Sequence, residues 1–132
     1  HDLGKIHEMA SDAMGLVSEY TTEGLLLGHL VEGAAAVARA GEKLGTRKEL
    51  VLMLQHMLIS HHDLPEYGSP RRPMFPEAEV LHILDLLDAR MFEMAHALGQ
   101  IAPGTFTDRI WSLDRKLYRR LEPDGGEGEG EM

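Results

Sequence analysis

The chain opens on His1-Asp2, a histidine and an aspartate whose side chains both bind divalent metals. Neutral imidazole and ionised carboxylate are ligands that Zn, Mn, Fe and Ni all accept. Adjacent in sequence, the pair could hold one ion between them, or the carboxylate could bridge two ions. The same dipeptide also occurs as two ordinary surface residues. The motif therefore predicts a metal site only if the fold brings further histidines and aspartates to it.

Three later segments offer such residues: His29, the pair His61-His62, and Asp85. Asp85 falls on the apolar stripe of a predicted helix, where an unpaired carboxylate would cost several kcal/mol. It must be protonated, paired or bound to a cation, and a salt bridge to Arg90 is the alternative to metal ligation. For His29 the alternative is a hydrogen bond in the core, and for His61-His62 it is the favourable field of a helix C-terminus. The other four histidines have weaker claims: His7, His56, His82 and His96.

Helical periodicity predicts the elements that would position these residues. Residues 3–20 suggest a short helix or an irregular connection, and no segment alternates as a strand does. Helices are predicted over 23–44, 47–61 and 77–98, with a last helix from Thr105 or Thr107 to about Arg120. The expected fold class is all-α, a helical bundle in one domain over residues 1–121.

Local signals predict where these helices begin and end. Threonine hydroxyls at 21–22 would cap the first long helix, and Gly45 would end it. The stretch 46–49, Thr-Arg-Lys-Glu, has the form of a capping box. The helix that follows is apolar nearly all round, which predicts a central, buried position. Pro76 suits the first position of the next helix.

Composition limits the class of protein. The 132 residues contain no cysteine, so neither disulfides nor a cysteine-ligated zinc site is expected. No segment has the length of a membrane span and no signal peptide is evident, which favours a cytoplasmic protein without a membrane partner. A formal net charge of −9 argues against a nucleic-acid platform on this chain alone. The acidic Gly-Glu tail at 122–132 is expected to be disordered.

The order of these motifs resembles the HD-domain metal-dependent phosphohydrolases: a His-Asp pair, a histidine in a helix, a double histidine, then an aspartate. More closely, it is similar to the C-terminal HD domain of a bacterial 3′–5′ exoribonuclease. The stretches that carry the likeness cover most of residues 1–120: HDLGK at 1–5, EYTTEGLLLGH at 19–29, LQHMLISHH at 54–62, EYGSPRRPMFPEAEVLHILDLLDAR at 66–90 and PGTFTDRIWSLDR at 103–115. The double histidine is also typical of cyclic-dinucleotide HD-GYP enzymes, but no Gly-Tyr-Pro is present.

The resemblance implies a metal centre with one or two ions. His1, Asp2 and Asp85 would hold the first ion, and Asp2 would bridge to a second held by His29 and His61, with His62 as a possible further ligand. It also implies a preference for manganese, although the nitrogen and oxygen ligands are equally compatible with iron, nickel or zinc. A further histidine ligand, the N-terminal helices of the bundle and an OB-type nucleic-acid-binding domain would lie upstream of His1, where we expect more sequence.

The implied activity is hydrolysis of phosphodiester bonds at the 3′ end of single-stranded RNA or DNA. Such a site would polarise the phosphate and activate a water for in-line attack. The catalytic residues would be Asp2, Lys5 and His62. Lys5, with Arg71 and Arg72 of the proline-rich loop 63–76, could contact the substrate phosphates. The alternatives are an HD phosphohydrolase of small nucleotides and a non-catalytic HD-like interaction module, and the sequence does not decide the oligomeric state.

Overall fold

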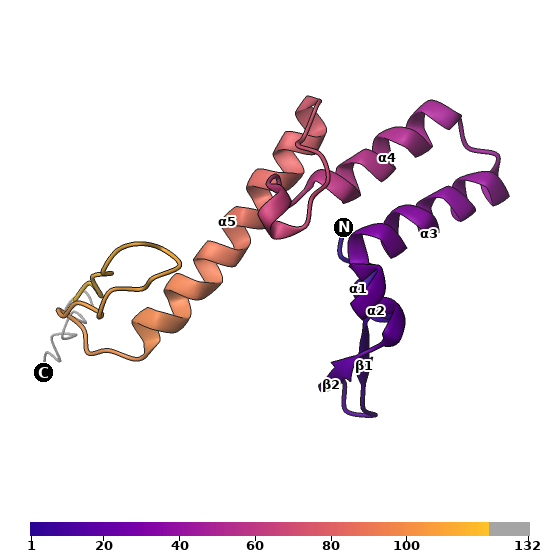
Figure 1. Ribbon diagram of the computed structural model, residues 1–132. Coiled ribbons are helices and arrows are strands. Elements are labelled where there is room, and N and C mark those ends of the chain that lie inside the picture. Colours follow the sequence, from indigo (N-terminus) through magenta and orange to yellow (C-terminus); the bar gives the residue numbers. More distant parts are fainter. Residues whose placement is uncertain (122–132) are drawn as a thin grey trace, which may run out of the picture. The chain divides into compact units, whose positions relative to one another are not determined.

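The computed structural model of the chain describes residues 1–121 (Figure 1). These residues are mainly helical, which confirms the predicted fold class. The chain divides into two compact units, His1–Leu86 and Leu87 onward, and each is described by itself below. The predicted disordered tail, 122–132, lies outside the described residues. None of the helices within 1–121 is both long enough and apolar enough to cross a membrane.

The first unit begins with a short helix and a small sheet. Helix α1 (Lys5–Glu8) leads into strand β1 (Met9–Ser11), which pairs antiparallel with β2 (Val17–Tyr20). The carboxylate of Asp12 closes the turn by accepting hydrogen bonds from the backbone N–H groups of Met14 and Leu16, at 2.8 and 3.0 Å. The prediction that no segment forms a strand is wrong here. All four β2 residues are exposed, so the hairpin lacks the buried face that produces an alternating pattern.

The helix predicted over 23–44 is two helices, α2 (Thr22–Leu26) and α3 (Gly28–Leu44). The break falls at Gly28, whose φ of 72° is left-handed and interrupts the helix. The two predicted ends are confirmed. The Thr21 hydroxyl accepts from the Gly24 N–H as the N-cap of α2, and Gly45, with φ 65°, ends α3.

Helix α4 (Lys48–Ser60) packs against α3 as the second half of a helical hairpin (Figure 1). The predicted capping box is not formed, because the N-cap is Arg47 and the Thr46 N–H donates back to the Gly41 carbonyl at the end of α3. The prediction of a buried helix is also wrong: Leu52 is 67% exposed. Helix α4 is therefore covered on only part of its surface, by α3 and by contacts such as that between His56 and Phe75.

Residues 61–75 form a connection that includes a short 3₁₀ turn (Pro65–Tyr67), as the prolines predicted. Helix α5 (Pro76–Gly99) follows and starts at the predicted proline. Up to Leu86 this helix belongs to the first unit. Its apolar stripe is only partly covered: Ala78 is fully buried, but Leu84 is 56% exposed.

The second unit contains a correction to the sequence analysis, since the helix predicted from Thr105 or Thr107 to Arg120 does not form. These residues make an antiparallel ribbon in which Phe106 lies opposite Tyr118 and Ile110 lies opposite Arg115. The residue that turns the chain is Asp114, with a left-handed φ of 54°. Aromatic and β-branched residues on the first arm (Thr105, Phe106, Thr107 and Ile110), with Tyr118 on the second, favour this extended form over a helix. We call residues 104–120 the C-terminal ribbon.

Candidate metal centre

Four separate segments of the first unit bring the predicted ligands together. His1 and Asp2 precede α1, His29 lies in the first turn of α3, His61 and His62 follow α4, and Asp85 lies on α5. Gly4 permits the close approach of the opening segment, with His1 and Asp2, to His29 on α3. A methyl group there would overlap the backbone carbonyl of His29, so only glycine lets the opening segment lie this close to α3.

The two carboxylate oxygens of Asp2 face different partners. Oδ1 lies 3.7 Å from Nε2 of His29 and 3.7 Å from Nε2 of His61. Oδ2 lies 3.5 Å from Nε2 of His1 and accepts a hydrogen bond from Nζ of Lys5 at 2.7 Å. The carboxylate of Asp2 therefore faces two imidazoles with Oδ1, and one imidazole and the Lys5 ammonium with Oδ2.

Three of these polar atoms are buried without a hydrogen-bond partner: Asp2 Oδ1, His29 Nε2 and His61 Nε2. Their separations of 3.7 Å are too long for hydrogen bonds. Two ligands of one ion with bonds of about 2.1 Å lie no more than about 4.2 Å apart, so these distances fit shared ligation. Buried polar atoms in proteins are almost always paired. A cation between them would satisfy all three.

The other nitrogen of each histidine explains why Nε2 is available. Nδ1 of His29 lies 3.0 Å from Oε2 of Glu8, and Nδ1 of His61 lies 2.6 Å from the Leu58 carbonyl. Because these partners accept hydrogen bonds, the proton belongs on Nδ1 and the lone pair of Nε2 points at Asp2. This is the arrangement by which outer-shell groups orient metal-binding imidazoles. The sequence analysis missed Glu8, which carries no motif of its own.

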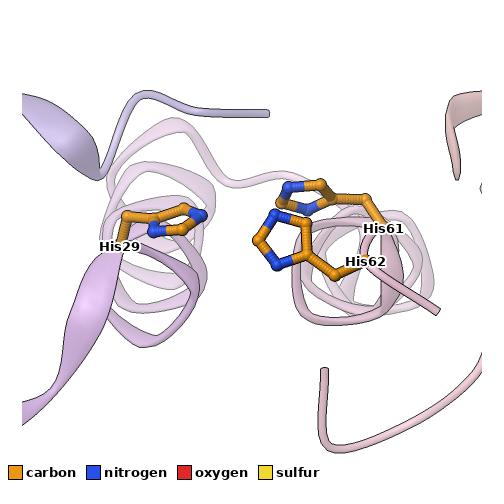
Figure 2. A group of neighbouring side chains, drawn as sticks. All are labelled: His29, His61 and His62. Atoms are coloured by element: carbon orange, nitrogen blue, oxygen red, sulfur yellow. The ribbon is translucent and has the colours of Figure 1, made fainter. Parts of the chain in front are cut away.

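His62 lies beside this group (Figure 2). One ring nitrogen from each of His29, His61 and His62 lies within 4.8 Å of the others. Nδ1 of His62 lies 2.8 Å from the Tyr67 carbonyl, which leaves its Nε2 without a proton as well. His62 is therefore close enough to serve as the predicted further ligand.

Asp85 and His1 form the other side of the centre. Nε2 of His1 lies 3.2 Å from Oδ1 of Asp85, and together with His61 they make a second group whose ligand atoms lie within 4.8 Å. The expectation of a buried carboxylate is wrong, since the side chain of Asp85 is 32% exposed. Its ion-pair partner within the described residues is His1 rather than Arg90.

The pKa values of the two central residues both move towards the metal-binding form. Burial alone would raise the pKa of Asp2, but the hydrogen bond and charge of Lys5, with the nearby imidazoles of His29 and His61, outweigh it and lower that pKa. Burial lowers the pKa of His61, more than its bond to the Leu58 carbonyl raises it. An ionised carboxylate and a neutral imidazole are the forms that bind metal.

The predicted phosphate-binding cations are placed differently. Lys5 is paired with Asp2, as described above. Arg71 is exposed, and the guanidinium of Arg72, 68% exposed, lies 3.7 Å from Asp63. Of the histidines with weaker claims, His82 supports the centre from outside. Its Nδ1 lies 2.7 Å from the backbone carbonyl of His61, which ties the end of α4 to α5.

Comparison with known proteins gives a class of similar protein, the bacterial 3′–5′ exoribonucleases. The chain is 44% identical over 118 residues to the 3′-5′ exoribonuclease YhaM of Bacillus licheniformis. The YhaM proteins of a Geobacillus species and of Bacillus subtilis are 43% and 42% identical over the same length. The match covers 89% of this chain, and the chain spans little more than a third of these relatives, 36–37% of their length. The predicted resemblance to a bacterial 3′–5′ exoribonuclease is therefore confirmed. No family model and no solved structure matches the chain.

Proposed function

We propose that this chain carries the metal centre of an HD-domain phosphodiesterase that removes nucleotides from the 3′ end of single-stranded RNA or DNA. The observation that carries the proposal is the convergence of Asp2 Oδ1, His29 Nε2 and His61 Nε2, three buried atoms without partners. The relatives named exoribonucleases supply the reaction class.

The residues present could hold two ions, and the ligand atoms for one ion are more available than those for the other. On one side, Asp2 Oδ1, His29 Nε2 and His61 Nε2 offer lone pairs that no hydrogen bond within the described residues occupies. On the other side, His1, Asp85 and Asp2 Oδ2 are close enough to share an ion, but Lys5 already binds Oδ2 at 2.7 Å. We therefore assign the tighter site to His29, His61 and Asp2. The ligands are all nitrogen and oxygen, and we propose manganese as the resident metal.

A divalent ion bound here supplies Lewis-acid polarisation of a phosphate and a lowered pKa for a coordinated water. The residues of the chain supply orientation and proton transfer. Lys5 holds the Asp2 carboxylate ionised and fixed in position. His62 has a free Nε2 lone pair at the edge of the centre, and we assign it the role of the base that accepts a proton from the attacking water.

The test compares metal binding and RNA hydrolysis in the unmodified chain and in Asp2→Asn. The substitution keeps the size of the side chain and removes its charge, and we expect manganese affinity to fall by more than about 100-fold, beyond the effect of an outer-shell change. Asp12→Asn is the matched control, because the amide oxygen preserves the turn between β1 and β2. Calorimetric titration with manganese measures affinity in both variants.

Hydrolysis is followed under single-turnover conditions with a single-stranded oligoribonucleotide labelled at its 5′ end. A ladder of shortened products from the unmodified chain, absent in Asp2→Asn and dependent on manganese, supports the proposal. Release of phosphate from mononucleotides with no shortening of RNA would assign the site to small nucleotides. Metal binding unchanged in Asp2→Asn would refute the metal centre itself.

A further inference from the structure

The positive charge of the chain is concentrated in the C-terminal ribbon. Residues 104–120 contain five of the 13 Lys and Arg residues but two of the 22 Asp and Glu residues. The ribbon therefore carries a formal charge of +3 in a chain whose total is −9. Two of its aromatic side chains are highly exposed, Phe106 at 65% and Trp111 at 80%. The net charge of the whole chain conceals this separation.

Backbone pairing divides the ribbon into two faces. The Thr107 N–H donates to the Leu117 carbonyl at 2.9 Å, and Phe106 pairs with Tyr118. Side chains alternate between the faces of an extended pair. Thr107 and Leu117, at 7% and 6% exposure, define the inner face. The outer face then carries Phe106, Lys116, Tyr118 and Arg120, all of them exposed.

The inner face of the ribbon is anchored by hydrogen bonds, and this holds the outer face in a fixed position. The guanidinium of Arg119 donates to the carbonyls of Leu98 and Ile101, at 3.3 and 2.7 Å, which anchors the ribbon to the end of α5. On the outer face, the rings of Phe106 and Tyr118 lie together with centroids 5.0 Å apart. Within residues 1–121, neither Lys116 nor Arg120 takes part in an ion pair. Their charges remain available to an external anion.

We infer that the outer face of the C-terminal ribbon binds single-stranded nucleic acid. Exposed aromatic rings stack on bases of any sequence, and cations beside them neutralise the backbone phosphates. Lys116 and Arg120 are four residues apart on an extended arm, about 13 Å, with Tyr118 between them. A phosphate chain that follows the arm would meet a cation, a ring and a second cation. The choice of RNA as ligand rests on the proposed function, whereas binding itself requires no metal and no hydrolysis.

Fluorescence anisotropy of a labelled oligoribonucleotide with the full chain tests this inference, in the presence of a chelator so that no hydrolysis occurs. Lys116→Ala/Arg120→Ala should weaken binding about tenfold and reduce the salt slope by about 1.4, at about 0.7 per phosphate contact on a single strand. Tyr118→Ser should weaken binding by a similar factor through lost stacking. Tyr118→Phe, which keeps the ring, should bind as the unmodified chain does.

The matched control is Arg39→Ala/Lys43→Ala, which removes two exposed cations, also four residues apart, from α3. It should leave binding unchanged. Equal losses of RNA affinity in both double variants would show that binding depends only on the total charge, which would contradict the inference. An unmodified chain that does not bind RNA would overturn the inference outright. If the exposed rings cover a second protein instead, sedimentation would show self-association that Tyr118→Ser abolishes, without RNA binding. Lys116→Ala/Arg120→Ala should bind manganese as the unmodified chain does, so failure of the metal centre and failure of the ribbon give different results.

Discussion

The candidate metal centre and the C-terminal ribbon are assembled from very different distances along the chain. The contact between His1 and Asp85 joins residues 84 positions apart, and the centre needs four segments to be in place at once. In the ribbon, Ile110 pairs with Arg115 and Phe106 with Tyr118, so its partners come from one continuous stretch. The centre therefore depends on the packing of the whole first unit, whereas the ribbon depends mainly on its own turn and on its anchor to α5.

The two regions also differ in how their polar atoms are satisfied. The centre leaves Asp2 Oδ1, His29 Nε2 and His61 Nε2 buried and unpaired. In the ribbon, the buried hydroxyl of Thr107 both accepts from the Leu117 N–H and donates to the Asp108 carbonyl. Unpaired buried atoms mark a place that needs a ligand for stability. We therefore expect ligand binding to stabilise the first unit far more than the ribbon.

Gly4→Ala should have the largest effect and should be confined to the centre. The new methyl group would overlap the backbone carbonyl of His29, and backbone cannot move aside as a flexible side chain does. We expect a loss of about 3 kcal/mol in the free energy of unfolding, at the upper end of overpacking effects. Urea denaturation followed by circular dichroism measures it. Gly99→Ala, with nothing near the added methyl, is the control and should cost nothing.

Leu117→Ala should damage the ribbon and spare the centre. Leu117 is 6% exposed, and its truncation should cost about 2–3 kcal/mol in local stability. Trp111 is the sole tryptophan of the chain and lies in the ribbon, so its fluorescence reports this region alone. Its emission should change at lower urea in the variant, while manganese affinity stays the same. A parallel loss of manganese binding would show that the two regions are not independent.

Glu8→Ala should weaken manganese binding about tenfold, the lower end of outer-shell effects, because His29 loses the carboxylate that holds its proton on Nδ1. Glu8→Gln should lie between the variant and the unmodified chain, since its amide oxygen still accepts that proton. Glu19→Ala, on the exposed strand β2, serves as the control. Equal affinities in all three variants would remove Glu8 from the centre.

Acidification should have the smallest effect and should act through His61. Its pKa is lowered in the folded chain by burial, so the unfolded chain takes up a proton first as the pH falls through the ordinary histidine value of about 6.5. The metal-free protein should lose stability there, by at most about 1.4 kcal/mol per pH unit for this one proton. Asp2, whose pKa is also lowered, should contribute only at much lower pH. Thermal melts in a chelator should show the histidine-range slope reduced in His61→Gln.

Much of the architecture was predictable because its signals are local. The Thr21 cap, the Gly45 end of α3, the proline-rich connection and the start of α5 at Pro76 all depend on the conformations that single residues prefer. Two of the wrong predictions, the helix over the C-terminal ribbon and the buried position of α4, share one cause. Extended pairing in the C-terminal ribbon and the exposure of α4 depend on which surfaces pack together. The periodicity of apolar residues does not predict which segments pair.

The same division holds for the site. The ligand types could be read from the sequence: a His-Asp pair, a helical histidine, a double histidine and an aspartate, whose order predicted the resemblance to a bacterial 3′–5′ exoribonuclease. Their arrangement came from the fold, with His29 and His61 at one oxygen of Asp2, His1 and Lys5 at the other, and Glu8 behind His29. Ligand types are fixed by covalent identity. Their distances are fixed by packing, which here depends on a glycine that lets two backbones meet.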